Sequence, residues 1–385
     1  MFKKTPLAWL QVTREKTRLL VAISGISFAN VLMFVQLGLR DALFDSAVRF
    51  HESLEGEIFL ISPQSVALIS MDQFTEKRLY QARGFKGVES VSPVYVDFAR
   101  WKNPESRKTR NIFIIGFNPN EKVFNLPGVQ ENVDKLKVPD VVLFDEASRN
   151  EYGPVVSEFN KNQAVITEVK NRKITVEGLF TLGTSFGADG NLITSELNFL
   201  RIFNVRRTKG LIDVGVIKIK SDANYQDVLK ELRNKLPDDV KVVSKEEFAD
   251  FEKGYWNSST PIGFIFALGA ALGFIIGIVI VYQIIYSDIS DHLPEYATLK
   301  AIGYTDRYLL FVVFQEAMIL AILGYLPGVS ISLIVYNGMR NATLLPIIMT
   351  VSRALLISTL TFLMCFISGA ISIQKLRSAD PAEIF

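Results

Sequence analysis

The stretch GYWNSSTPIGFIFALGAALGFIIGIVIVYQIIYS, residues 254–287, contains no charged side chain. A helix needs about 20 apolar residues to cross the hydrocarbon core of a bilayer, which is about 30 Å thick. Three further stretches are equally apolar: residues 19–39, residues 354–374, and residues 308–339, in which Glu316 is the one charged side chain. The sequence therefore predicts four transmembrane helices.

Two other interpretations of these stretches stay open. Buried core helices of a soluble protein are one alternative, although 49 % of the residues are hydrophobic. A cleaved signal peptide is an alternative for the first stretch. The segment 36–40, QLGLR, offers no good small-x-small cleavage site, which favours a retained helix.

Basic residues near the helix ends predict the orientation, because cytoplasmic flanks carry an excess of Lys and Arg. Those before the first helix and after the last are Lys3, Lys4, Arg14, Lys16, Arg18, Lys375 and Arg377. Both termini are therefore expected in the cytoplasm, as is the loop between helices 2 and 3. Residues 40–260 are expected outside, in a multi-pass protein of the inner (plasma) membrane.

The external segment, residues 40–260, carries mixed strand and helix signals. Two β-α-β patterns predict a split ferredoxin-like, or porter-like, part at about 50–101 and 211–245, with a strand-rich insert at about 102–210. Ser244, followed by Glu247, predicts a capped helix leading into helix 2. The predicted strands are 57–62, 88–101, 111–117, 141–144, 164–169, 174–180, 211–220 and 240–243, and the predicted helices are 72–83 and 224–236.

The predicted fold class is thus a membrane α-helical bundle of four transmembrane helices, with a large α+β extracytoplasmic domain between helices 1 and 2. Residues 5–18 are expected to form an amphipathic helix on the inner membrane surface, and a basic flank that only sets topology is the alternative. The expected segments are 1–18 (cytoplasmic amphipathic helix), 19–39 (TM1), 40–260 (extracytoplasmic domain), 261–286 (TM2), 287–306 (cytoplasmic coupling-helix loop), 307–339 (TM3), 340–352 (outer loop), 353–374 (TM4) and 375–385 (cytoplasmic tail).

The motifs of the common enzyme and cofactor sites are missing from the sequence. The glycine-rich stretch 183–191, GTSFGADGN, lacks the lysine of a phosphate loop and is either a functional, tightly turning loop or a plain surface loop. His51 and His292 are expected on opposite sides of the membrane. A net charge of +2 does not favour nucleic-acid binding, and the single cysteine, Cys365, allows no internal disulfide. Catalytic, cofactor and metal residues are therefore not predicted.

Glu316 is the ionisable residue that lies well inside a predicted membrane helix. It is nine residues beyond Arg307, which places it about 13 Å along the helix. A charge at that depth is costly, so we expect Glu316 to make an intramembrane polar contact that organises the bundle. A position near the interface, reached by helix tilt, is the alternative. The segment GYLPG, residues 324–328, is expected to break or kink the same helix.

The stretch EYATLKAIGYTDRYL, residues 295–309, predicts a short helix between two membrane helices. Pro294 suits a first helical turn, Gly303 suits a C-terminal stop, and Thr305 can cap the next helix. Such a helix exposes apolar and charged side chains that suit docking to another protein, and a connector at the lipid surface is the alternative. The candidate docking residues are Glu295, Tyr296, Leu299, Lys300, Ile302 and Tyr304.

The whole chain resembles the permeases of the MacB/FtsX type of ABC transporter. The resemblance rests on residues 295–328, on the C-terminal KLRSADPAEIF at 375–385, and on the N-terminal LAWLQVTREKTRLLVAISGISFA, residues 7–29. Within the family, residues 183–203 look most like DevC, the heterocyst-type exporter permeases.

This resemblance implies a homodimer with separate ABC ATPase subunits, which hold the ATP and Mg and contact the six docking residues. The chain itself is expected to be non-catalytic. DevC-like members are expected to export a glycolipid or other amphiphile by mechanotransmission, with a periplasmic membrane-fusion adaptor and a TolC-like outer-membrane duct, as in tripartite efflux. An FtsX-like signalling scaffold that regulates a cell-wall hydrolase and a lipoprotein-extraction permease are the alternatives.

Overall fold

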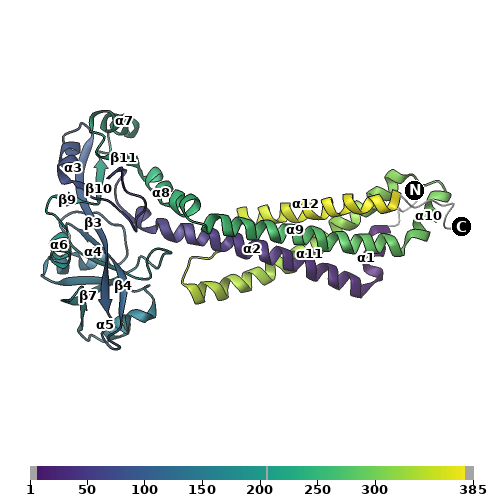
Figure 1. Cartoon of the computed structure of the whole chain (residues 1–385), viewed down its shortest axis with the longest axis horizontal. Coiled ribbons are helices and arrows are strands. Elements are labelled where there is room, and N and C mark those ends of the chain that lie inside the picture. Colours follow the sequence, from purple (N-terminus) through teal and green to yellow (C-terminus); the bar gives the residue numbers. More distant parts are fainter. Residues whose placement is uncertain (1–6, 205–206, 378–385) are drawn as a thin grey trace. The chain divides into compact units, whose positions relative to one another are not determined.

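A computed structural model describes residues 7–204 and 207–377 (Figure 1). Its contacts divide the chain into two compact units. We call the described residues of Met1–Ala42, Ile262–Thr343 and Ile347–Phe385 the helical unit, and Leu43–Pro261 with Leu344–Pro346 the sheet unit. The sheet unit therefore lies in the chain between the first and second long helices. The last part of the predicted tail, residues 378–385, lies outside the described residues, as do residues 1–6.

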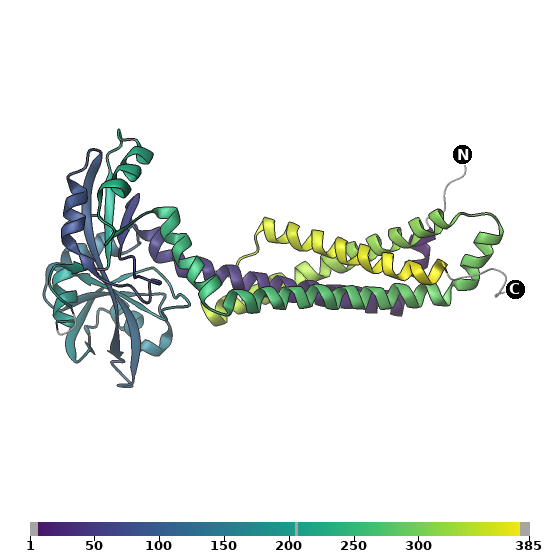
Figure 2. The ribbon, with the colours of Figure 1, turned by 45° about the horizontal axis from the view of Figure 1, so that its top comes forward.

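The helical unit is built from long apolar helices. Its elements are α1 (Leu7–Arg14), α2 (Lys16–Ser53, which continues into the sheet unit), α9 (Ile262–Asp291), α10 (Leu293–Ala301), α11 (Asp306–Thr343) and α12 (Val351–Arg377). Among the described residues, four of these helices, α2, α9, α11 and α12, are long and apolar enough to cross a membrane. They run side by side in both ribbon views (Figure 2).

Small residues let these helices approach closely. A Cβ added to Gly277 of α9 would lie 3.1 Å from the Cβ of Ala29 in α2. Gly324 of α11 lies against Ile26 of α2, where an added Cβ would meet the Ile26 Cβ at 2.5 Å. Close backbone approach through small residues is the usual way in which membrane helices associate. The close packing of α2 against both α9 and α11 therefore depends on these two glycines. A count of apolar residues does not single them out.

Residues 324–328, where the sequence predicts a break or a kink, do not break the helix. Helix α11 continues from Asp306 to Thr343 with Pro327 inside it. Neighbouring helices hold this stretch in place: the Ser27 hydroxyl donates to the Gly324 carbonyl at 2.9 Å, and the Tyr325 hydroxyl donates to the Ala354 carbonyl at 2.8 Å. A proline is tolerated in a membrane helix when its neighbours support the backbone in this way.

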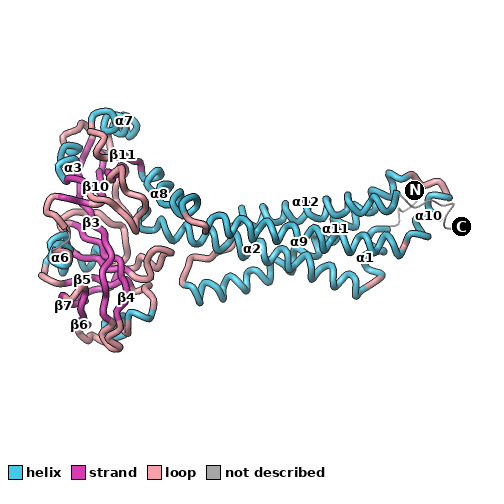
Figure 3. The backbone as a smooth tube through the Cα atoms, in the orientation of Figure 1, coloured by secondary structure: helices cyan, strands magenta, loops and turns pink. Residues whose placement is uncertain are grey.

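The sheet unit contains a nine-stranded sheet with the order β11-β1-β10-β3-β4-β8-β5-β7-β6 (Figure 3). Its strands are β1 (Ile58–Ile61), β3 (Val88–Lys102), β4 (Thr109–Phe117), β5 (Val141–Asp145), β6 (Val165–Val169), β7 (Arg172–Phe180), β8 (Asn191–Ser195), β10 (Val214–Ile219) and β11 (Lys241–Ser244), and β2 (Phe74–Thr75) pairs with β9 (Leu211–Ile212). The helices of this unit are α3 (Glu76–Arg83), α4 (Val129–Asn132), α5 (Val155–Asn160), α6 (Glu196–Ile202), α7 (Tyr225–Lys235) and α8 (Lys245–Gly254), with short turns η1 (Val133–Lys137), η2 (Asn150–Tyr152) and η3 (Tyr255–Ser259).

Four antiparallel neighbours, β11-β1-β10-β3, form the part that the two β-α-β patterns predict, with α3 and α7 in the crossovers. Strand β3 pairs with β10 through its first half and with β4 through its second half. The expected boundary at residue 101 is therefore not a break in the sheet, because the strands of the predicted insert continue from β4 onward.

Each face of this sheet covers a separate apolar core. Strand β1 shows the alternation: Ile58 and Leu60 enter one core, and Phe59 and Ile61 enter the other. Phe248 of α8 packs in the same core as Phe59, at a ring-centroid distance of 5.3 Å. The predicted capping box of α8 is confirmed, since Ser244 and Glu247 each bond the backbone N–H of the other.

Candidate functional site

The first candidate site is α10 with the turn that follows it. Pro294 lies in the first turn of α10, and Gly303 stops the chain after it with a φ of +105°. That value lies in the left-handed region, which favours glycine. Helix α9 extends to Asp291, so α10 occupies only the middle of the predicted loop 287–306.

The six candidate docking residues do not share one surface. Ile302 and Tyr304 are 71 % and 44 % exposed, and Glu295 is also exposed. Leu299 and Lys300 are half-buried. Tyr296 is 1 % exposed and packs in the core of the helical unit. Its assignment to the outward surface is therefore corrected.

The spacing of the buried positions explains this outcome. Leu293, Tyr296 and Leu299 follow one another at intervals of three and pack against the core of the helical unit. The opposite side leaves Glu295 in solvent, and the turn after α10 exposes Ile302 and Tyr304. The Tyr304 ring lies against that of Tyr308, with 4.9 Å between the centroids. An exposed apolar pair beside a charged residue is a surface that suits a protein partner.

Beside α10, a cluster of charged residues joins α1 and α2 to the end of α9. Arg14 pairs with Glu295 at 3.2 Å, and both side chains are more than half exposed. Arg18 of α2 pairs with Asp288 at 3.1 Å, with Glu15 at 3.3 Å, and with Asp291. The Asp288 side chain is only 6 % exposed, so this pair lies at the edge of the interior.

Glu316 of α11 is 3 % exposed and interacts with the Asp288 carboxyl. It lines a small cavity together with Glu15, Arg18 and Asp288. Asp288 Oδ2 and Glu316 Oε2 have no hydrogen-bond partner among the residues that the structure describes. The contact expected of Glu316 is thus with another acid, and its role in organising the bundle stays a prediction.

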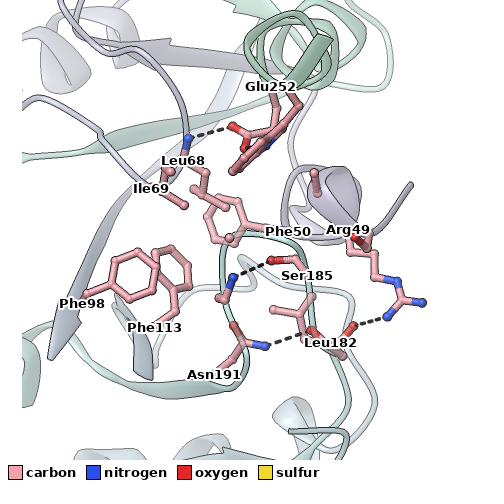
Figure 4. Close-up of a pocket in the computed structure, with 16 residues that line it drawn as sticks. Arg49, Phe50, Leu68, Ile69, Phe98, Phe113, Leu182, Ser185, Asn191 and Glu252 are labelled. Atoms are coloured by element: carbon pink, nitrogen blue, oxygen red, sulfur yellow. Dashed lines mark hydrogen bonds between the residues drawn. The ribbon is translucent and has the colours of Figure 1, made fainter. Parts of the chain in front are cut away.

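The second candidate site is a small pocket in the sheet unit (Figure 4). Aromatic side chains dominate one side of it, where Phe50, Phe98 and Phe113 lie near one another. Arg49 donates to the Leu182 carbonyl at 3.4 Å at the other side, and its guanidinium points away from these rings (Figure 4). The pocket is therefore apolar inside and polar along one edge.

The glycine-rich stretch 183–191 forms a wall of this pocket, which favours its interpretation as a tightly turning loop. Buried Asp145 holds the stretch by accepting hydrogen bonds from the backbone of Leu182 and Gly183 at 3.1 and 2.9 Å, and from the Asn191 amide at 2.7 Å. Burial raises the pKa of the Asp145 carboxyl above its ordinary value, and these hydrogen bonds oppose that rise.

Glu252 of α8 closes another side of the pocket. It accepts hydrogen bonds from the Leu68 backbone at 2.7 Å and from the Trp256 indole at 2.8 Å. Its carboxyl lies 3.8 Å from the Nε2 atom of His51, and both of these side chains are buried. Burial raises the pKa of Glu252, while its two donors lower it.

Sequence reasoning missed Arg18, Asp288 and Asp291 as interacting residues. In the sequence, Arg18 indicates only the topology, and Asp288 and Asp291 fall within the predicted loop 287–306. A signal was present, because a basic residue at the start of one apolar stretch and acids at the end of another are expected at the same membrane depth. Among residues 7–204 and 207–377, no group of three or more His, Cys, Asp or Glu side chains could hold a metal ion.

Comparisons with known proteins place the α10 region in a domain family. Residues 264–381 match the family model described as FtsX-like permease C-terminal. The FtsX-type resemblance is therefore supported for the helices α9 to α12, while the match does not address the DevC subfamily. No curated protein sequence matches the chain.

Two solved structures are similar to about half of the chain. The periplasmic region of MacB from Actinobacillus actinomycetemcomitans is 13 % identical, with a TM-score of 0.35, and the match covers 51 % of this chain and 92 % of that one. The extracellular domain of the ABC-type transporter YknZ from Gram-positive bacteria is 15 % identical, with a TM-score of 0.33, and the match covers 49 % and 99 %. Similarity at this level says nothing about substrates or partners.

Proposed function

We propose that this chain is the non-catalytic permease subunit of an ABC transporter, and that a separate ATPase subunit supplies the ATP hydrolysis. The observation that carries the proposal is the match of residues 264–381 to the FtsX-like permease C-terminal domain, which contains α10 and its exposed surface. The expected assembly is a homodimer in the inner membrane with both termini in the cytoplasm. The basic flanks of α2 and α12 support that orientation.

The ATPase would dock on the exposed residues Glu295, Ile302 and Tyr304, with Leu299 and Lys300 at the edge. Two exposed apolar side chains provide an anchor for a groove on the partner, and the neighbouring charge fixes the orientation. Tyr296 contributes indirectly, because it packs α10 onto the helical unit.

The finer proposal is that the transporter works by mechanotransmission and moves a glycolipid or other amphiphile, with an adaptor and an outer-membrane duct as further partners. The resemblance to DevC-type permeases motivates the adaptor and the duct. Aromatic rings line the interior of the pocket of Figure 4, which suits the apolar part of an amphiphile in chemistry.

Co-purification with a candidate ABC ATPase subunit, expressed together with this chain, tests the docking surface. Ile302→Asp should remove most of the bound ATPase, because a carboxylate replaces an apolar anchor. Leu197→Asp is the matched control, since Leu197 is an aliphatic residue of α6 in the sheet unit that is 65 % exposed. Normal ATPase binding by Ile302→Asp and Glu295→Lys, or ATP turnover by the purified permease alone, would contradict the proposal.

A further inference from the structure

Two neighbouring loops of the sheet unit carry no charged side chain. They are SPQSVALISM, residues 62–71, and TLGTSFGA, residues 181–188. Val66 in the first loop and Phe186 in the second are each 49 % exposed, although both side chains are apolar. Single exposed apolar residues are common on soluble surfaces, but two of them on uncharged loops that touch each other indicate a contact with an apolar medium or partner.

The second loop presents Phe186 on a tight turn. The Ser185 N–H donates to the Ala188 carbonyl at 2.9 Å, and the Ser185 hydroxyl accepts from the Ala188 N–H at 3.0 Å (Figure 4). These two bonds close a turn that has Phe186 and Gly187 at its end. The position of the exposed ring is therefore set by the backbone of the turn.

The two loops and Trp256 of η3 pack against one another. A Cβ added to Gly187 would lie 2.6 Å from Cγ2 of Ile69 and 3.6 Å from the Trp256 ring, so only a glycine lets the loops approach this closely. The Phe186 ring stands edge-on to the Trp256 ring, with 4.9 Å between the centroids. One face of this small cluster is thus supported by protein, and the exposed part of Phe186 is not.

Glu252 of α8 fastens the cluster from behind. Its carboxylate accepts from the Trp256 indole N–H at 2.8 Å and from the Leu68 N–H of the first loop at 2.7 Å. Trp256 is only 6 % exposed, so its ring is a fixed support for Phe186. The uncharged surface is therefore held by a single buried side chain.

The chain keeps this cluster close to the membrane. Trp256 lies six residues before Ile262, the first residue of the membrane helix α9, and no charged residue separates them. Six residues span at most about 20 Å, even when fully extended. Aromatic side chains gather at the boundary between membrane and water, because their rings are apolar while groups such as the indole N–H are polar.

The charges that adjoin the two loops already have partners. Asp189, which follows the second loop, pairs with Arg149 at 2.7 Å and also with Arg110. Asp72, which follows the first loop, accepts from the Ser62 hydroxyl at 3.2 Å. These carboxylates are therefore poorly suited to recognise a charged protein partner, which leaves apolar contact as the main interaction open to the surface.

We propose that the tip of residues 185–188, with Phe186 foremost, lies in the lipid interface of the leaflet in which α9 begins, with the Val66 loop beside it. The occupant of this surface is the boundary between lipid headgroups and acyl chains. An uncharged loop enters that boundary without stripping water from a charge, and it buries the apolar area of the ring. The contact anchors the sheet unit to the bilayer, whether or not an ATPase docks on α10.

The test uses the full chain in lipid nanodiscs, with the buried Cys365 replaced by alanine. A nitroxide attached to Phe186→Cys is relaxed by collision with oxygen, which concentrates in lipid, or with a nickel chelate, which stays in water. Leu197→Cys is the matched control, since Leu197 is an exposed aliphatic residue of α6 and belongs to neither loop. We expect the ratio of oxygen to nickel accessibility to be several-fold higher at Phe186→Cys than at Leu197→Cys.

A second set of variants tests the Phe186 ring itself. The nitroxide is attached to Val66→Cys, and residue 186 is either left unaltered or changed. Phe186→Trp should keep the lipid-like ratio, because an aromatic ring remains, whereas Phe186→Asp should lower the ratio toward the Leu197→Cys value. Size-exclusion profiles and unfolding temperatures of the two variants control for folding, which an exposed side chain should not disturb.

The outcomes decide between lipid, water and protein. A ratio at Phe186→Cys no higher than at Leu197→Cys would place the loop in water and overturn the proposal. Low accessibility to both reagents would mean that protein, such as a second copy of the chain, covers Phe186, and would overturn it as well. An unchanged ratio at Val66→Cys after Phe186→Asp would remove the anchoring role of the ring. Failure of an ATPase to bind contradicts the proposed function alone, because this test contains no ATPase.

Discussion

Two arginines fasten the helical unit near opposite ends of α2, and they are held in different ways. Arg353 of α12 is 5 % exposed, and its Nη2 donates to Asp41 at 2.7 Å. Its Nη1 donates to the Ile348 carbonyl at 2.7 Å and to the Tyr336 hydroxyl at 3.4 Å. Asp41 also pairs with Arg40 at 3.1 Å. Arg18, at the other end, pairs with three acids at once: Glu15, Asp288 and Asp291.

The difference teaches which end is held more tightly. At Asp41 two cations share one anion, and all three guanidinium nitrogens of Arg353 have acceptors. At Arg18 one cation serves several anions, and two buried carboxylate oxygens have no partner among the described residues. Removing one partner of a buried pair is strongly destabilising. Arg353 is therefore a structural lock, whereas Arg18 pairs with three acids and is itself less buried than Arg353.

The largest effect is expected from breaking the lock. Arg353→Met leaves Asp41 without its buried partner and the Ile348 carbonyl without its donor. We expect a loss of about 2–4 kcal/mol in the free energy of unfolding of the helical unit. Thermal unfolding in detergent measures the loss. Arg340→Met is the control, because Arg340 is exposed and donates to Asn337 of the same helix at 2.9 Å. Equal unfolding temperatures for the two variants would remove the contrast between the two ends.

The second effect concerns Glu316 at the Arg18 end. Glu316→Leu removes a polar group from among buried polar neighbours, whereas Glu316→Gln keeps hydrogen bonding and lowers the number of acids around Arg18. We expect Leu to cost about 0.6–2 kcal/mol and Gln to be neutral or slightly stabilising. Unfolding temperature and ATPase co-purification measure both variants. The same stability for Leu, Gln and the unaltered chain would leave Glu316 without a role in the bundle.

A smaller effect is expected from the pH dependence of the sheet unit. Burial raises the pKa of Glu252 in the folded state, so its contribution to stability is present below the unfolded pKa and is lost as pH rises through the folded pKa. Glu252→Gln removes this titration. The free energy of unfolding should therefore fall less steeply between about pH 4.5 and neutrality in the variant, where 4.5 is near the ordinary value for glutamate. A steeper fall in the variant would mean that Glu252 is stabilised as an anion.

The sequence was sufficient for the long helices and for most strands, because both follow from apolar runs and alternation. The four apolar stretches lie largely within α2, α9, α11 and α12. Strand β8 was missed because three of its five residues, Asn191, Thr194 and Ser195, are polar. Two of them bond partners far along the chain: the Val141 carbonyl accepts from Thr194 at 2.7 Å, and Asp145 accepts from the Asn191 amide at 2.7 Å.

The candidate site was predicted less completely than the fold. Helix α10 follows from Pro294 and Gly303, which are local signals. The inward direction of Tyr296 depends on which side of α10 meets α9 and α11, and no local pattern gives that side. The Arg18 cluster joins residues about 270 positions apart, as the hydrogen bond to Asp288 shows. Pairing at that separation depends on how α2 packs against α9. The role of glycines such as Gly277 in that packing can be recognised only once the packing itself is known.

The smallest effect is expected at the exposed pair of Arg14 and Glu295, which lies beside the Arg18 cluster. Both side chains are more than half exposed, at 64 % and 55 %, so solvent screens their attraction and each keeps its hydration when the pair opens. Arg14→Ala should change the free energy of unfolding by less than about 0.5 kcal/mol, and the change should vanish at high salt. Glu295 has a second proposed role in docking, so Glu295→Lys should weaken ATPase binding while Arg14→Ala leaves it nearly unchanged. Unfolding curves at low and high salt, together with ATPase co-purification, measure both properties. A stability loss for Arg14→Ala as large as that for Arg353→Met would show that exposure does not separate the two kinds of ion pair, and that α1 is part of the lock.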